Sequence, residues 1–205
     1  MDTTTVAAFL AVDLLLVLTP GADWAYAIAA GLRDRSVVPA VAGLIAGYAG
    51  YTLLAVAGLV MIVASSSSVL TALTVAGSVY LMWLGVGVLR RPATPVAATE
   101  VVSASRRQVA LKGVGISSLN PKALLLYFSL FPQFIDSASR WPVAAQTGLL
   151  GALHMAACAV VYLGVGVLAR TVLKARPSAA RAVTRASGAM MLLIGAFLLA
   201  ERLAQ

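Results

Sequence analysis

Residues 13–32 read DLLLVLTPGADWAYAIAAGL, an apolar stretch that the step Thr19–Gly21 interrupts. The stretch lies inside a longer apolar run at about residues 4–31. A helix needs about 20 apolar residues to cross the hydrocarbon core of a bilayer, so this run predicts a transmembrane helix. Proline removes a backbone hydrogen bond and clashes with the preceding turn, so we expect the helix to break at Pro20, near its middle.

The rest of the chain repeats the apolar character of this segment. Hydrophobic residues make up 61% of the 205 residues, charged residues make up 11%, and the mean hydropathy is +0.96. Soluble domains are about 45–50% apolar and about 25% charged, so lipid is the expected solvent. The first run lacks a basic leader and is too long for a signal peptide, so we expect it to be retained. Further apolar runs lie at about 37–63, 69–89, 110–135, 142–169 and 186–203.

These runs do not alternate as barrel strands do, and backbone groups in lipid must be bonded within their own segment. We therefore predict a multi-pass, all-α membrane protein of six transmembrane helices. Basic residues concentrate in the first, third and fifth connectors, which predicts cytoplasmic odd loops and both termini outside. Because the basic residues lie in short connectors between apolar runs, the net charge of +8 does not indicate nucleic-acid binding. The basic residues of these three connectors are Arg33, Arg35, Arg90, Arg91, Arg106, Arg107, Lys112, Arg170, Lys174, Arg176, Arg181 and Arg185.

A segment rich in Pro, Ala, Ser and Thr divides the chain into two halves. We predict a first three-helix repeat at 1–91, a cytoplasmic linker at 92–109 and a second three-helix repeat at 110–205. Because each half has an odd number of helices, the second repeat is inverted relative to the first. The sequence SSLNPK at 117–122 places Pro121 near the middle of the fourth run. Interrupted helices in corresponding positions point to a transport site; the alternative is a pair of structural kinks.

Each proline is preceded by a residue type that often caps helices. Thr19 and Asn120 are therefore expected to begin new half-helices whose free N–H groups lie near the bilayer centre. Asp23 and Lys122 follow closely, and intramembrane charges usually face the bundle interior. We hypothesise that Asp23 binds the ammonium group of an amino acid and that Lys122 binds its carboxylate; alternatively, the two charges neutralise each other as a packing pair. The predicted substrate-binding residues are Thr19, Pro20, Gly21, Asp23, Asn120, Pro121 and Lys122.

Proton coupling has candidate residues in the first and fifth runs. Burial favours proton exchange at a carboxyl group, so Asp13 and Asp23 are candidates; the alternative for Asp13 is a position near the surface. His154, the only histidine, is a candidate relay or a packed, hydrogen-bonded residue. Tyr48 and Tyr51 either pack or line a cavity.

The sequence contains no catalytic signature. H-E-x-x-H, nucleophile-elbow and Walker motifs are missing, so we predict no enzyme activity, no cofactor and no metal site. Cys158 is the only cysteine, which excludes an intrachain disulfide. Without a nucleotide site, transport is expected to run on an ion gradient or on the gradient of the substrate. Gly43 and Gly47 form a G-x-x-x-G motif suited to helix contact, and a homodimer through glycine-rich faces is one prediction.

Two motifs resemble those of the LysE/RhtB-type amino-acid exporters, the lysine exporter superfamily. Leu18–Asp23 resembles the family's L-T-P-G-P-(D/N) segment, with Ala22 in place of the second proline. N-P-K at 120–122 and F-P-Q-F at 131–134 resemble its second conserved stretch. The resemblance implies export of amino acids or related small metabolites across the cytoplasmic membrane by proton antiport. It does not fix the substrate, and a cation exporter, a passive channel or a non-transporting membrane protein are the alternatives.

Overall fold

The computed structural model describes residues 1–33, 36–58, 67–92, 105–120, 122–123, 126–136, 138–172 and 175–203. Within these ranges the fold has seven α-helices and no β-strand. A π-helical turn, Leu126–Leu130, and a 3-10 turn, Phe131–Phe134, lie between the helices labelled α6 and α8. The α-helices are α1 Thr3–Leu18, α2 Ala22–Arg33, α3 Val38–Val56, α5 Ser67–Arg90, α6 Arg106–Ser118, α8 Val143–Thr171 and α9 Pro177–Leu203.

The predicted break in the first apolar run is confirmed. Helices α1 and α2 meet at an angle of 57° across residues 19–21. The expectation that Thr19 caps α2 is wrong, because Thr19 ends α1: its amide and its hydroxyl both donate to the carbonyl of Leu15. The carbonyl of Gly21 accepts the first helical bond of α2, from Ala25 at 2.9 Å.

The fourth apolar run is also interrupted. Helix α6 ends at Ser118, and the side-chain oxygen of Asn120 accepts from the amide of Lys122 at 3.0 Å. Asn120 thus caps the residues that follow it, as predicted. Pro121 lies outside the described residues. The predicted helix to residue 135 ends in the π and 3-10 turns, and Pro132 stands in the first turn of the 3-10 segment, where its missing N–H costs no bond.

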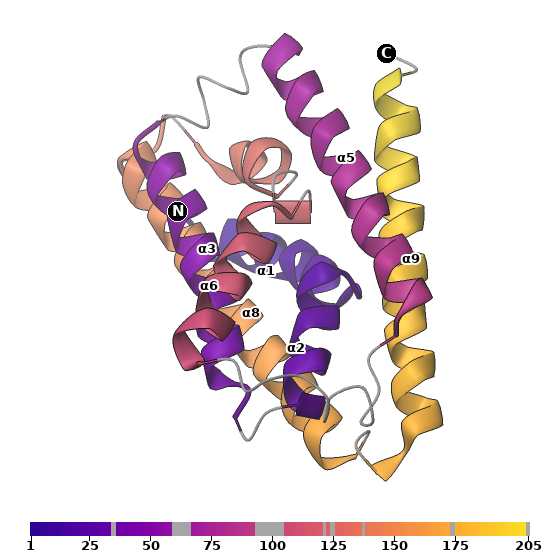
Figure 1. The fold of residues 1–205 in the computed structure, drawn as a ribbon. Helices are drawn as coiled ribbons and strands as arrows, with labels where there is room; N and C mark the ends of the chain where they lie inside the picture. Colours follow the sequence, from indigo (N-terminus) through magenta and orange to yellow (C-terminus); the bar gives the residue numbers. More distant parts are fainter. Residues whose placement is uncertain are drawn as a thin grey trace.

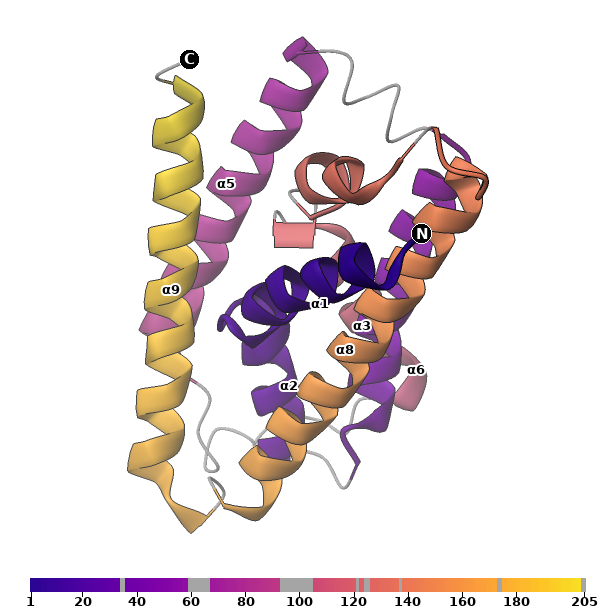
Figure 2. The same ribbon diagram turned by 180° about the vertical axis from the view of Figure 1, so that it is seen from behind.

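The helices form two groups that the two views show side by side. Helices α5 and α9 run along one edge, and α1, α3, α6 and α8 form the other group, with α2 in contact with both α8 and α9 (Figures 1 and 2). Small residues allow the close α5–α9 contact: a Cβ atom on Gly85 would lie 2.8 Å from the carbonyl oxygen of Gly188. Gly85 and Gly188 therefore serve a contact between two helices of the same chain.

Two described helices, α3 and α8, are long and apolar enough to cross a membrane, and the bent pair α1–α2 would make a third. Six spans therefore remain a prediction. Large apolar side chains cover the surface of this membrane protein, as contact with lipid requires. Leu15 and Leu53 are both 70% exposed and Val160 is 73% exposed.

The basic helix ends gather at one end of the molecule. The last turns of α2 and α8 and the first turn of α9 lie together at the lower end of Figure 1. Arg33, Arg170 and Arg181 belong to these ends, and all three are exposed. Helix α9 begins at Pro177, earlier than the predicted 186, and α6 begins at Arg106, inside the segment predicted as linker. The earlier start of α6 follows from a capping box between Ser105 and Gln108.

Candidate functional site

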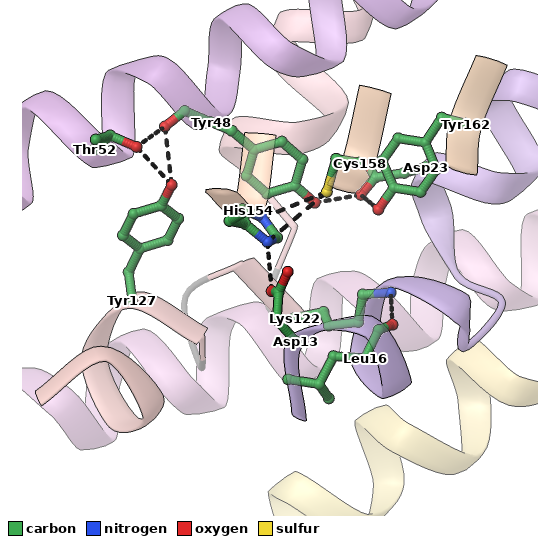
Figure 3. A network of polar contacts seen from close by, with 10 residues as sticks. All are labelled: Asp13, Leu16, Asp23, Tyr48, Thr52, Lys122, Tyr127, His154, Cys158 and Tyr162. Carbon is green, nitrogen blue, oxygen red and sulfur yellow. Dashed lines mark hydrogen bonds and ion pairs between the residues drawn. The ribbon is translucent and has the colours of Figure 1, made fainter. Parts of the chain in front are cut away.

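Asp23 lies at the first turn of α2 and is 1% exposed. Its Oδ2 atom accepts hydrogen bonds from the hydroxyls of Tyr48, at 2.5 Å, and Tyr162, at 3.1 Å (Figure 3). A third bond comes from Nδ2 of Asn120, at 2.9 Å. The Oδ1 atom is buried without a partner in the part of the chain that the structure describes. The Asn120 contact joins the second interruption of the chain directly to the first.

Lys122 completes this junction from the other side. Its ammonium donates to the carbonyl oxygen of Leu16 at 2.8 Å and to that of Thr19 at 3.0 Å. Both carbonyls belong to the last turn and cap of α1, the negative end of its helix dipole. The break therefore has a cation at the carboxyl end of α1 and a carboxylate, Asp23, at the amino end of α2. Each charge is complementary to the helix end that it contacts.

Asp23 and Lys122 form no ion pair within 4.0 Å in the part of the chain that the structure describes, so whether they neutralise each other as a packing pair stays a prediction. Among the described residues, the acid–base contact within 4.0 Å joins Asp13 and His154 instead. Asp23 is held by hydroxyl and amide donors, and Lys122 is held by backbone carbonyls. The two charges need no direct contact because helix ends and neutral groups already stabilise them.

A second buried polar pair lies on α1 and α8. His154 Nδ1 is 2.7 Å from Oδ1 of Asp13, and Asp13 is 0% exposed, so the near-surface alternative for Asp13 is wrong. The Nε2 atom of His154 lies 3.5 Å from the sulfur of Cys158. Oδ2 of Asp13 has no partner among the described residues. The hydrogen bond between Nδ1 and Oδ1 needs one proton, and the histidine tautomer decides which of the two atoms donates it.

Buried tyrosines connect these groups. The ring of Tyr48 meets the His154 ring edge to face, with centroids 4.6 Å apart. The hydroxyl of Tyr127 bonds to Thr52 at 2.7 Å and donates to the Tyr48 carbonyl at 3.2 Å. Sequence reasoning missed Tyr127 and Tyr162. The available signal was a tyrosine hydroxyl inside an apolar run, because a buried hydroxyl must find a polar partner.

A small pocket opens beside the junction. The empty space among its lining atoms is about 200 Å³, a figure that includes open solvent, and the enclosed part is about 10 Å³. Lys122 and His154 both line it, so it brings the cation of the second interruption next to the buried Asp13–His154 pair. The other walls are Leu16, Val17, Tyr48, Ala123 and Leu126.

The structure brings most of the predicted substrate-binding residues together. Asp23 and Asn120 are bonded, and the carbonyl of Thr19 is bonded to Lys122. Gly21 faces the same ammonium, since a Cβ atom placed on it would lie 3.9 Å from Nζ of Lys122. Pro20 stands between Thr19 and Gly21 at the bend, and Pro121 lies outside the described residues. The described residues contain no cluster of three His, Cys, Asp or Glu side chains that could hold a metal ion.

Buried charges at interrupted apolar helices are typical of membrane transporters. The family of LysE type translocators matches residues 14–202, and the chain belongs to that family. The chain is 29% identical to a homoserine/homoserine lactone efflux protein of Salmonella typhimurium over 95% of its length and 96% of the relative. It is 30% identical to a leucine efflux protein of Klebsiella pneumoniae over 64% of each chain. It is also 33% identical to an uncharacterized membrane protein of Vibrio cholerae over 79% of each chain. No solved structure matches the chain.

Proposed function

We propose that the protein exports small neutral amino acids across the cytoplasmic membrane by proton antiport, through the junction of its two interrupted helices. The observation that carries the proposal is the Asn120–Asp23 hydrogen bond, which joins the two interruptions around buried charge. Family membership supports a translocator rather than an enzyme. The printed names of the relatives include efflux proteins for homoserine, leucine and threonine, which supports neutral amino acids.

The proposed substrate site uses both charges of the junction. An amino acid carries an ammonium and a carboxylate group, and the junction offers a carboxylate and an ammonium. The free Oδ1 of Asp23 is an acceptor for the substrate ammonium. Lys122 lines the pocket. Its ammonium binds the substrate carboxylate after it has released the carbonyls at the end of α1. Thr19, Pro20, Gly21, Asn120 and Pro121 shape the two helix ends that carry these charges.

The proposed proton site is the pair Asp13–His154. A neutral His154 leaves two carboxylates, Asp13 and Asp23, facing one lysine, Lys122. A protonated His154 balances the charges, which matters because uncompensated charge in a low-dielectric interior is costly. We propose that this balance couples proton uptake to substrate release, with Asp23 as the second candidate for the coupled proton.

The proposed architecture keeps six spans in two inverted repeats, with the basic helix ends in the cytoplasm. The gathering of Arg33, Arg170 and Arg181 at one end of the molecule supports this orientation. The homodimer stays a prediction. The two glycines of the G-x-x-x-G motif, Gly43 and Gly47, face Ala110 and Ser117 of the same chain.

The test is transport by the purified protein in proteoliposomes. Vesicles loaded with labelled leucine, threonine, homoserine or lysine are given an inward or an outward pH gradient, and efflux is measured against protein-free vesicles. We expect efflux of the neutral amino acids that accelerates when protons can move in the opposite direction. Efflux that ignores the gradient would leave a channel or uniporter, and flux of metal cations alone would favour the cation exporter.

A further inference from the structure

We infer that Tyr48 is a positioning residue that couples the proton pair Asp13–His154 to the substrate carboxylate Asp23. The inference rests on the proposed function, because it assigns the connection between the two sites named there. Tyr48 is 1% exposed, on α3, and belongs to neither pair.

One side chain contacts both sites, Asp23 through its hydroxyl and His154 through its ring. The Tyr48 hydroxyl donates to Oδ2 of Asp23 at 2.5 Å. The ring itself meets the His154 ring at 4.6 Å and an interplanar angle of 84° (Figure 3). The described residues show no direct hydrogen bond or ion pair between Asp23 and either His154 or Asp13, so Tyr48 provides a contact path between them.

The backbone of Tyr48 is tied to the second interruption. Its carbonyl accepts from the hydroxyl of Thr52 at 3.0 Å and from the hydroxyl of Tyr127 at 3.2 Å. Tyr127 lies in the π-helical turn that follows Lys122, and its ring also meets the His154 ring edge to face, at 6.0 Å. A movement of the segment after the second interruption therefore acts on Tyr48 and on His154 together.

The chemistry of the hydroxyl makes this contact sensitive to protonation. A tyrosine hydroxyl has one proton, and Tyr48 donates a hydrogen bond with it to Oδ2 of Asp23. The same oxygen also accepts hydrogen bonds from Asn120 and Tyr162. A cationic imidazole interacts with an aromatic ring differently from a neutral one. The charge on His154 thus changes the preferred position of the Tyr48 ring, and that position determines whether Asp23 keeps this donor.

The pH response belongs to the whole cluster that surrounds Tyr48. Helices α1 and α2 each contribute a carboxylate to this cluster. The chain after α6 contributes a lysine and a tyrosine, and α8 contributes a histidine, a thiol and a tyrosine. These groups are Asp13, Asp23, Lys122, Tyr127, His154, Cys158 and Tyr162.

The experiment compares Tyr48→Phe with Tyr162→Phe in proteoliposomes loaded with labelled leucine or threonine. Both variants remove one hydroxyl donor to Asp23, but of the two tyrosines it is Tyr48 whose ring contacts the ring of His154. The readout is the ratio of efflux driven by a pH gradient to exchange at equal pH. Both variants are expected to slow exchange. The ratio should fall by about tenfold in Tyr48→Phe, the size of a typical coupling between sites, and should stay near the wild-type value in Tyr162→Phe.

An unchanged ratio in Tyr48→Phe, or an equal fall in both variants, would overturn the inference. A wild-type protein whose efflux ignores the gradient would instead refute the antiport itself and the coupling with it. If Tyr48→Phe does not fold, 3-fluorotyrosine at position 48 keeps the side chain's shape and makes its hydroxyl more acidic. The pH at which exchange is half-maximal should then shift relative to wild type, and an unshifted profile would overturn the role of Tyr48.

Discussion

The amide nitrogen Nδ2 of Asn120 lies 2.9 Å from Oδ2 of Asp23, although 97 residues separate them in the sequence. The other end of the same amide, Oδ1, accepts from the backbone of Lys122. One side chain thus fixes the carboxylate of the first interruption and orders the chain that carries the lysine of the second. The two interruptions form one structural unit for this reason.

Asn120→Asp should disable export more severely than Asn120→Ser. The aspartate variant keeps an oxygen for the Lys122 amide but replaces the Asp23 donor with a second carboxylate. Loss of a hydrogen bond to a charged group costs about 1.5–3 kcal/mol, which corresponds to a slowing of about tenfold or more if the bond is needed during transport. Efflux of labelled amino acid from cells with matched membrane abundance measures this. Wild-type activity of Asn120→Asp would show that the donor to Asp23 is dispensable.

Lys122→Met should destabilise the junction, whereas Lys112→Met should not. Methionine leaves the carbonyls of Leu16 and Thr19 without the ammonium donor, and a buried unsatisfied group costs about 1–3 kcal/mol. Lys112 is exposed on α6 and serves as the matched control. Thermal unfolding in detergent should show a lower midpoint for Lys122→Met alone. An unshifted midpoint would mean that water satisfies these carbonyls equally well.

Gly43→Ala should disturb the contact between α3 and α6, and Gly50→Ala on the same helix should not. A Cβ atom on Gly43 would collide with the backbone of Ala110, whereas a Cβ atom on Gly50 has no neighbour within 4 Å. Overpacking typically costs about 1–3 kcal/mol, while alanine is the better helix former at an open position. Unfolding midpoints of the two variants, measured in the same detergent, compare these effects. A stable Gly43→Ala protein would contradict the tight packing.

Arg140→Cys and Arg181→Cys should react from opposite sides of the membrane. Both positions are exposed, and Arg181 lies at the basic end of the molecule, near the start of α9. The native Cys158 is buried and should stay unlabelled. A membrane-impermeant maleimide should label Arg140→Cys in intact cells and Arg181→Cys only after lysis. The reverse pattern would invert the proposed orientation, and labelling of both in intact cells would refute it.

Local signals in the sequence predicted the interruptions but not their details. Pro20 predicts a break because proline disrupts the interior of a helix. The role of Thr19 was wrong because the same residue type can cap a helix start or bond back to the preceding turn, and the local sequence does not decide between the two. The prediction that Asn120 caps the residues after it was right, because its side chain bonds to a residue two positions away, which is a local interaction.

The partners of the buried charges could not be predicted in the same way. Asp13 and His154 are 141 residues apart, and Asp23 and Tyr162 are 139 residues apart. No periodicity in the sequence encodes such pairs, because they depend on how α8 packs against α1 and α2. The sequence did indicate which side chains need partners, since charges inside apolar runs must be satisfied somewhere.

The central claim is that amino acids leave the cell through the junction at Asp23, and the most direct measurement is efflux by the Asp23→Asn variant. Proteoliposomes with this variant are compared with wild type and with Asp136→Asn, which removes an exposed carboxylate away from the junction. The account predicts that Asp136→Asn exports labelled leucine or threonine at the wild-type rate and that correctly folded Asp23→Asn exports none above protein-free vesicles. Export by Asp23→Asn at the wild-type rate would contradict it.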